Sequence, residues 1–247
     1  MKKIAVVLML LAMAGCAWAA DDSLFDQANA KYQSGDFKSA AALYEQGIQS
    51  GQSTASTYYN LGNARFRLKQ KGKAMASYER ALSLSPRDPD IQWNIDVLRS
   101  ILTDRLEESS DNFTFYWIKN KLTLFTPDEM NWDLTGLLGL LALMVLAGLW
   151  LPKLRSLIGL IQGIAFFLLL MMALLFIVKW NEIKDPRVVI LDKEVTARYG
   201  PSEKETAAFL LHEGAKAKAT DASRDWLYIT LENKNSGWIR KESCEII

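Results

Sequence analysis

Charged residues are absent from three stretches of the chain, and each stretch is predominantly apolar. They are Ile4–Ala20, Leu134–Pro152 and Ser156–Val178. The last two approach the roughly 20 apolar residues that a helix needs to cross a bilayer. Because only three residues separate them, no domain fits between them. The pattern therefore predicts two transmembrane helices, over residues 134–152 and 156–178, that form a hairpin between two water-exposed parts.

The first apolar stretch has the layout of a targeting segment rather than of a membrane span. Lys2 and Lys3 precede it, its apolar part is short, and small residues follow around Ala17 and Ala19. This three-part layout is typical of secretory signal peptides. We therefore expect a signal peptide over residues 1–20, and with it bacterial export. An alternative takes Cys16 as the acylated cysteine of a lipoprotein processing site.

Residues 21–108 contain an internal repeat. A shift of 34 residues superposes Tyr44 on Tyr78, and this is the length of a tetratricopeptide repeat. The second copy carries most of that family's pattern in Tyr58, Leu61, Gly62, Ala74, Tyr78, Ala81 and Pro86. Arg65 departs from the pattern, which has tyrosine there. The segment resembles the tetratricopeptide family, and the resemblance implies an all-α solenoid of two repeats with a capping helix over about 91–106.

The same resemblance places function on the concave face, which the first helix of each repeat lines. Mapped onto this chain, the candidate partner-binding residues are Phe25, Asn29, Tyr32, Tyr59, Asn63, Phe66 and Trp93. Members of the family that clamp a terminal carboxylate use basic residues, and Phe25, Asp90 and Asn94 replace these here. The resemblance thus implies an aromatic groove for a protein segment. In the alternative, these aromatic residues pack against the capping helix or the membrane-proximal segment.

Residues 109–133 form a predicted interfacial connector between the repeats and the first membrane helix. The connector is rich in aromatic residues, and amphipathic rings favour the headgroup zone of a bilayer. A packed connector is the alternative. At its end, Thr126, Pro127 and Glu129 have the pattern of a helix start, in which threonine and glutamate cap each other and proline takes the first helical position.

The loop between the two membrane helices carries Lys153 and Arg155 without an acidic residue. Such a charge is typical of cytoplasmic loops, so we expect an inner-membrane protein with both soluble parts in the periplasm. In the second membrane helix, Gly159 and Gly163 form a G-x-x-x-G face, which is typical of close helix packing. We expect this face to pack the hairpin on itself. Packing against a second copy or another membrane protein is the alternative.

Residues 185–247 show short strand-like runs separated by turn signals. The runs are 188–191, 195–198, 209–211, 226–231 and 238–239. In the clearest one, Trp226, Tyr228 and Thr230 alternate with aliphatic residues, so one set should face a core. The strings 195–202, 225–226 and 237–239 resemble a bacterial Src-homology-three-type barrel, a small all-β fold.

That resemblance also suggests roles for individual residues. Barrels of this type bind peptides or cell-wall stems, and Tyr199, Trp226 and Tyr228 are the candidate binding face. Trp238 is expected in the interior. His212 is interpreted as a turn residue and not as a base or ligand, and Cys244 as a half-buried strand residue.

The charge balance and the scarcity of reactive residues exclude several classes of protein. The 29 basic and 28 acidic residues give a net charge of +1 without a basic block, so nucleic acid is not an expected partner. Two cysteines and one histidine are too few for a zinc site or a histidine-based triad. Nothing places two carboxylates in one pocket with a base or metal. We therefore expect neither an enzyme nor a cofactor or metal site.

The order of signal peptide, tetratricopeptide array, membrane hairpin and terminal barrel resembles the E component of the Bacteroides aerotolerance (Bat) group. The resemblance implies a non-enzymatic scaffold in the inner membrane that acts in envelope or oxidative-stress tolerance. Its implied partners are von Willebrand-type membrane proteins and a MoxR-type ATPase. In the alternative, the barrel binds peptidoglycan peptides and the repeats only space it from the membrane.

Overall fold

The computed structural model describes residues 22–104, 126–150, 155–184 and 186–247. These residues belong to two compact units. One unit joins the short helices to the C-terminal sheet, and the other holds the two long helices that lie between them in sequence. The predicted signal peptide, Cys16 and most of the predicted connector lie outside the described residues.

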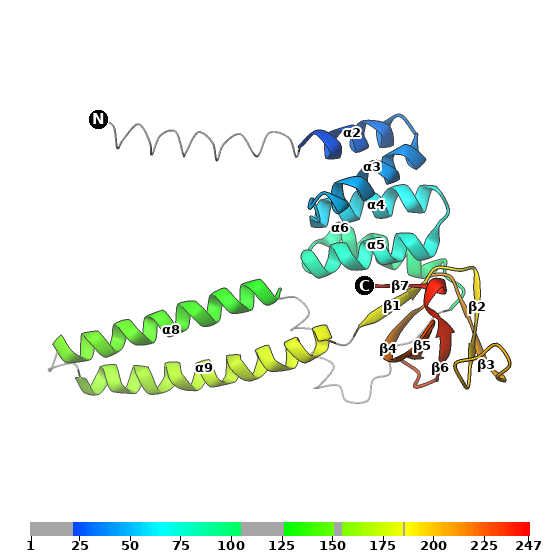
Figure 1. The fold of residues 1–247 in the computed structure, drawn as a ribbon. Coiled ribbons are helices and arrows are strands. Elements are labelled where there is room, and N and C mark those ends of the chain that lie inside the picture. The colour runs from blue at the N-terminus through cyan, green and yellow to red at the C-terminus, as the bar shows by residue number, and fades with distance from the viewer. Residues whose placement is uncertain (1–21, 105–125, 151–154, 185) are drawn as a thin grey trace, which may run out of the picture. The chain divides into compact units, whose positions relative to one another are not determined.

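The first unit begins with five helices that stack side by side (Figure 1). They are α2 (Asp22–Gln33), α3 (Phe37–Gln49), α4 (Ala55–Arg67), α5 (Lys71–Leu84) and α6 (Pro89–Ser100). The side chains of Asp36, Thr54 and Asp88 accept hydrogen bonds from first-turn N–H groups and so begin α3, α4 and α6. The chain thus forms two helical hairpins and a closing helix, which is the predicted solenoid.

Small and large residues pair where these helices cross. Ala74 is fully buried, and Tyr44 and Tyr78 are only 1% and 2% exposed. A Cβ atom on Gly62 would lie 2.5 Å from Cε1 of Tyr78, which is closer than packed atoms approach. Glycine is therefore required at this crossing, and the interpretation of these residues as packing residues is confirmed.

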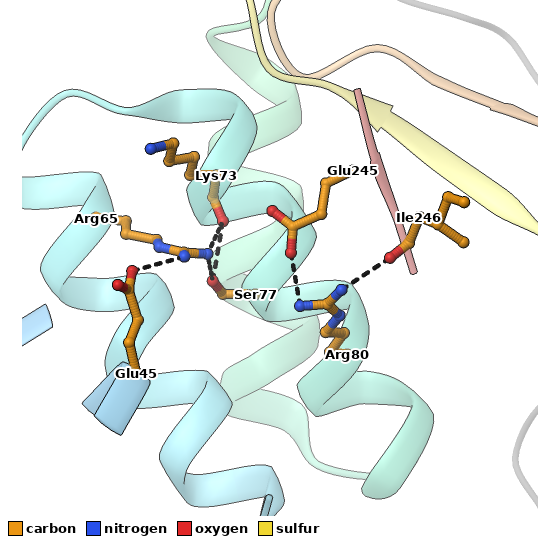
Figure 2. Close-up of polar contacts among 7 residues, drawn as sticks. All are labelled: Glu45, Arg65, Lys73, Ser77, Arg80, Glu245 and Ile246. Atoms are coloured by element: carbon orange, nitrogen blue, oxygen red, sulfur yellow. Dashed lines mark hydrogen bonds and ion pairs between the residues drawn. The ribbon is translucent and has the colours of Figure 1, made fainter. Parts of the chain in front are cut away.

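Arg65 stands where the tetratricopeptide pattern has tyrosine, and it fills the position with polar contacts (Figure 2). Its Nη1 atom donates to Ser77 Oγ at 2.8 Å and to the Lys73 carbonyl at 3.2 Å. Its Nη2 atom lies 2.8 Å from the Glu45 carboxylate, and the side chain is only 11% exposed. The arginine thus joins α3, α4 and α5 by hydrogen bonds, where a tyrosine would do so by packing.

The first unit ends in an antiparallel sheet of seven strands (Figure 1). They are β1 (Arg187–Ile190), β2 (Glu194–Arg198), β3 (Ala207–His212), β4 (Lys216–Ser223), β5 (Trp226–Thr230), β6 (Ser236–Arg240) and β7 (Cys244–Ile246). The order is β3-β2-β6-β5-β4-β1-β7, and no pairing joins β3 to β7 in the part of the chain that the structure describes. The arrangement is consistent with a Src-homology-three-like domain, but the sheet is open and not the closed barrel that the sequence predicts.

The core of the sheet follows the alternation along β5. Leu227, Ile229 and Leu231 are 6%, 0% and 5% exposed and belong to one apolar cluster, as predicted. Trp238 does not lie in the interior, as the sequence predicts. It is half-buried and lies beside Tyr228, with ring centroids 5.2 Å apart. Neighbouring side chains point to opposite faces of a strand, and Ile239 takes the core position.

The second unit consists of α8 (Pro127–Trp150) and α9 (Arg155–Lys184), which lie side by side (Figure 1). The segments Asp128–Ala147 and Ser156–Ile177 are long and apolar enough to cross a membrane. Many of their large apolar side chains are exposed. Lipid accommodates such a surface, whereas an exposed apolar surface of this extent is rare on proteins in water.

The predicted start of α8 is confirmed. The N–H of Thr126 donates to Glu129 Oε2 at 3.0 Å, and the N–H of Glu129 donates to Thr126 Oγ1 at 3.2 Å. Pro127 is the first helical residue, where its missing N–H costs no helix hydrogen bond.

Gly159 and Gly163 do not form the contact between α8 and α9 that their spacing predicts. Both are exposed, and among the described residues nothing lies within 4 Å of a Cβ built on either. Among the side chains of α9 that the structure describes, Ala165 is the buried one, with 7% exposure. Small residues permit a close approach of two helices but do not require one.

Candidate protein-interaction site

The seven predicted partner-binding residues of the helical array come from the first helices of successive hairpins and from the closing helix. They are Phe25, Asn29 and Tyr32 on α2, Tyr59, Asn63 and Phe66 on α4, and Trp93 on α6, and we call them the first-helix face. The first six are half-buried. Trp93 is 69% exposed, which leaves a large apolar side chain in solvent.

A hydrogen-bond set joins α2 to its neighbours beneath this face. The hydroxyl of Tyr44 donates to Oδ1 of Asn29 at 2.5 Å. The side-chain amide of Asn60 donates to the same oxygen at 3.1 Å. The set therefore ties together α2, α3 and α4 through one amide oxygen.

An equivalent set occurs one repeat later. The hydroxyl of Tyr78 donates to Oδ1 of Asn63 at 2.7 Å, and the amide of Asn94 donates to that oxygen at 2.9 Å. Asn94 also donates to the hydroxyl of Tyr59 at 3.1 Å. Asn63, Tyr78 and Asn94 each lie 34 positions after their counterparts in the first set. The same hydrogen-bond arrangement thus occurs twice in the array, one repeat apart.

These contacts fix the orientation of the Asn29 and Asn63 amides. Each oxygen accepts two hydrogen bonds, and a flipped amide would turn its NH₂ group toward two donors. Burial raises the pKa of Tyr44 to about 12 and that of Tyr78 well above its ordinary value, so both hydroxyls stay protonated. Neither Nδ2 atom has a hydrogen-bond partner among the described residues, and neither is buried. Both therefore offer N–H donors at the first-helix face.

Three aromatic residues of the face, Phe25, Tyr32 and Tyr59, rest on other rings. The centroid distances are 5.9 Å for Phe25 and Tyr44, 5.1 Å for Tyr32 and Phe37, and 6.0 Å for Tyr59 and Tyr78. All three pairs are tilted or edge-on, which is a favourable geometry for aromatic rings. Each ring is thus held by the fold and keeps part of its surface exposed.

Sequence reasoning missed Asn60 and treated Asn94 only as an absent basic residue. A signal for both was available, because the shift that superposes Tyr44 on Tyr78 also superposes Asn60 on Asn94. A polar residue that recurs at half-buried positions needs a recurring partner.

The three predicted residues of the sheet do not come together as one surface. Tyr199 is 70% exposed, whereas Trp226 is 7% exposed and lies beneath Arg240, whose guanidinium is 4.8 Å from the ring centroid. Tyr228 packs on Trp238. Trp226 also borders a cavity with a volume of about 230 Å³, and neither Tyr199 nor Tyr228 lines it.

Ion pairs occupy the wall of that cavity. Arg240 Nε lies 2.9 Å from Glu203 Oε1, and Arg198 Nη2 lies 3.1 Å from Glu203 Oε2. The hydrogen bond from Arg240 is the main cause that lowers the pKa of Glu203. Both guanidinium groups are thus already paired with a carboxylate of the protein itself.

His212 is the last residue of β3, and it contacts Asp104, in the segment that follows α6, instead of serving only a turn. Its Nδ1 atom lies 2.8 Å from Asp104 Oδ1, and its backbone N–H donates to Asp104 Oδ2 at 2.6 Å. Cys244 is a half-buried residue of β7, as predicted, and burial raises the pKa of its thiol to about 11. Within the described ranges, no group of three or more His, Cys, Asp or Glu residues could hold a metal ion.

Comparisons with known proteins identify the helical array. A family model of the tetratricopeptide repeat matches residues 25–89, which confirms the predicted repeat there. No match was found among curated proteins. The chain is similar to the Yersinia enterocolitica type III secretion chaperone SycD in complex with a peptide of the translocator YopD. The sequence identity is 14% and the TM-score is 0.29, and the match covers 42% of this chain and 88% of that one. It is also similar to another structure of that translocator chaperone, at 16% identity and a TM-score of 0.30, over 62% of this chain and 83% of that one.

Proposed function

We propose that this protein is a membrane-anchored, non-enzymatic scaffold whose first-helix face binds an extended segment of a partner protein. The observation that carries the proposal is the pair of outward amide donors on Asn29 and Asn63, which buried tyrosines hold in equivalent orientations. The tetratricopeptide match over residues 25–89 supports a role in protein interaction.

The spacing of the two amides suits a polypeptide main chain. Because Asn60 of α4 donates to Asn29 of α2, these helices are direct neighbours, and packed helices lie about 8–10 Å apart. In a polyproline II segment, every third carbonyl points the same way after about 9 Å. The amides of Asn29 and Asn63 would then donate to carbonyls i and i+3 of such a segment.

Selectivity among partners would come from the aromatic residues, since hydrogen bonds from the amides to main-chain carbonyls do not depend on the side chains of the partner. Trp93 is the strongest candidate, because a tryptophan that is 69% exposed loses most of its water contact when it is covered. Tyr59 and Phe66 add half-buried apolar surface on α4.

The proposal places the protein in the bacterial inner membrane with both soluble parts in the periplasm. The two candidate spans and the positively charged residues of the loop between them support this placement. Its architecture supports membership of a Bat-type complex for envelope or oxidative-stress tolerance. Von Willebrand-type membrane proteins and a MoxR-type ATPase are then the proposed partners.

Changing Asn29 and Asn63 together to aspartate tests the amide donors. Aspartate has the shape of asparagine and still accepts from the tyrosine and from Asn60 or Asn94, but it replaces the outward NH₂ group by an oxygen. We expect the variant to fold and to lose at least about tenfold in partner binding, because two donors are lost and two carboxylates face carbonyl oxygens.

A photoreactive residue at position 93 measures this effect in intact membranes through the yield of protein adducts. The control is Asn233→Asp, which makes one such substitution on an exposed loop of the sheet and should leave the yield unchanged. Equal yields from the double variant and this control, at equal thermal stability, would show that the amides do not hold the partner.

A further inference from the structure

The sheet packs against the end of the helical array. Strands β1 and β7 contact α5. Val189 of β1 is fully buried in the same apolar cluster as residues of α5 and α6, and Ile247 packs on the edge of this cluster. A residue near the C-terminus thus completes the core of the repeats.

A polar side chain of the sheet domain also provides a hydrogen-bond acceptor for the N-terminus of α5. Glu213 accepts a hydrogen bond from the backbone N–H of Gly72 at 2.8 Å. The first N–H groups of a helix have no partner within it, and Gln70, at the N-cap of α5, makes no side-chain cap. Residues of the sheet therefore cap a helix more than a hundred positions earlier in the chain.

A second contact lies further along α5 (Figure 2). The Nη1 atom of Arg80 is 2.6 Å from the Glu245 carboxylate, and its Nη2 atom donates to the Ile246 carbonyl at 2.8 Å. Arg80 is only 34% exposed and Glu245 21%, so solvent screens the pair incompletely. Edge strand β7 is thereby fixed to the helix.

The contact also buries a charge. Glu79 of α5 is 7% exposed, with Lys216 Nζ at 2.8 Å and Arg99 Nη2 at 3.6 Å from its Oε1. Burial raises the pKa of Glu79, but the charge and hydrogen bond of Lys216, and the charges of Arg99 and Arg187, outweigh it, so the pKa lies below its ordinary value. The sheet provides two of these three cations.

Two glycines show how closely the parts meet. A Cβ on Gly72 would overlap the carbonyl oxygen of Ile190, and one on Gly214 would lie 2.6 Å from Cδ2 of Leu102. Gly214 also has a φ of +89°, which other residues rarely adopt. At both points there is no space for a water layer between helix and sheet.

We infer that the sheet is the C-terminal cap of the helical solenoid, and that the two water-exposed parts of the chain fold as one body on one side of the membrane. A solenoid needs a terminal cap over its last core face, and the sheet covers that face. The chain leaves this body after the helices and rejoins it at Arg187, so α8 and α9 cross a bilayer as a pair or not at all. This inference does not depend on what binds the first-helix face.

Acid should weaken the contact between sheet and helices. Because the pKa of Glu79 is lowered in the folded protein, its stabilisation is complete above the ordinary value of 4.5 and is lost as the pH falls through the folded-state pKa. Thermal unfolding of the full chain in detergent, from about pH 7 to pH 3.5, measures this loss. In Glu79→Gln the acid-dependent decrease should be smaller; an identical decrease would contradict a stabilising, ionised Glu79 at this contact.

Cysteine labelling tests whether the two water-exposed parts of the chain lie on the same side of the membrane. Ser56→Cys on α4 and Asn233→Cys in the sheet are both at exposed positions. In spheroplasts, a membrane-impermeant maleimide should label both sites or neither, with each site read by mass spectrometry of its peptide. Cys244 should react poorly, since its thiol pKa is about 11. Labelling of one site before lysis and of the other only afterwards would overturn the inference.

Limited proteolysis of the full chain in detergent tests the docking itself. Alanine favours a helix interior over glycine, so Gly72→Ala should harm the protein only if β1 lies against α5. We expect cleavage between the two parts to become about tenfold faster in Gly72→Ala and to stay unchanged in the neighbouring, exposed Lys73→Ala.

If Gly72→Ala does not fold, an exchange of the charges of Arg80 and Glu245 tests the same contact. Arg80→Glu and Glu245→Arg should each speed cleavage, and the double variant should return the rate to within about threefold of the original. Equal rates in all variants, or a double variant that is worse than both single ones, would contradict the docked cap.

Discussion

Lys216→Met is expected to lower the free energy of unfolding of the first unit by about 2–4 kcal/mol, because it leaves the carboxylate of Glu79 buried without its nearest cation. The Nζ atom of Lys216 lies 2.8 Å from Glu79 Oε1, whereas Arg99 lies at 3.6 Å and is 45% exposed. Methionine keeps a similar length and fills the same space. Urea denaturation of the full chain in detergent, followed by tryptophan fluorescence, measures the change.

The control is Lys204→Met, which removes the same charge at an exposed position and should change stability by less than about 0.5 kcal/mol. A second variant, Glu79→Leu with Lys216→Met, should recover most of the loss, since an apolar pair can replace a buried ion pair. If Lys216→Met is no worse than Lys204→Met, the ion pair does not stabilise the contact between sheet and helices.

Gly62→Ala is expected to destabilise the helical array by about 1–3 kcal/mol, although the same change in an open helix stabilises by roughly 1 kcal/mol. The new methyl group would lie 2.5 Å from the ring of Tyr78. That ring cannot move freely, because its hydroxyl is bonded to Asn63 at 2.7 Å. Thermal unfolding of the full chain measures the loss.

Gly47→Ala is the comparison for this prediction. There the three atoms nearest to the added Cβ belong to the side chain of Gln52, and the nearest lies at 3.1 Å, so the overlap is smaller than the 2.5 Å contact at Gly62. We expect a change of no more than about 1 kcal/mol in either direction. Equal effects of the two substitutions would contradict the close crossing of α4 and α5.

The helical array was predictable because its signals are local and repeat. Ala74, Ala81, Gly62 and the tyrosines one repeat apart define the crossings of neighbouring helices by their spacing alone. The two long apolar segments were predictable for a similar reason, since their composition alone decides the environment they need.

The contact between sheet and helices was not predictable from the sequence. Glu79 and Arg80 look like ordinary surface charges of a helix, and their partners Lys216 and Ile246 come 137 and 166 positions later. Contacts between residues so far apart in the sequence produce no periodic pattern from which they could be predicted.

One strand, β4, was also missed, because its residues favour other structures. β4 (Lys216–Ser223) faces the core with Ala217 and Ala219, which are small and have low strand propensity. β7 has three residues, and of these only Cys244 was predicted to lie in a strand. The misplacement of Trp238 has a different cause, since the residue that faces the core in β6 is Ile239, and Trp238 therefore lies on the opposite face beside Tyr228.

In the proposed complex, one continuous partner segment lies along the first-helix face. Photoreactive residues placed separately at Tyr32 on α2 and at Trp93 on α6, in intact membranes, test it most directly when the attachment points are mapped by mass spectrometry. We expect both probes to attach to the same short stretch of one partner, in a fixed order along its sequence. Attachment to unrelated proteins, to lipid alone, or in no consistent order would contradict it.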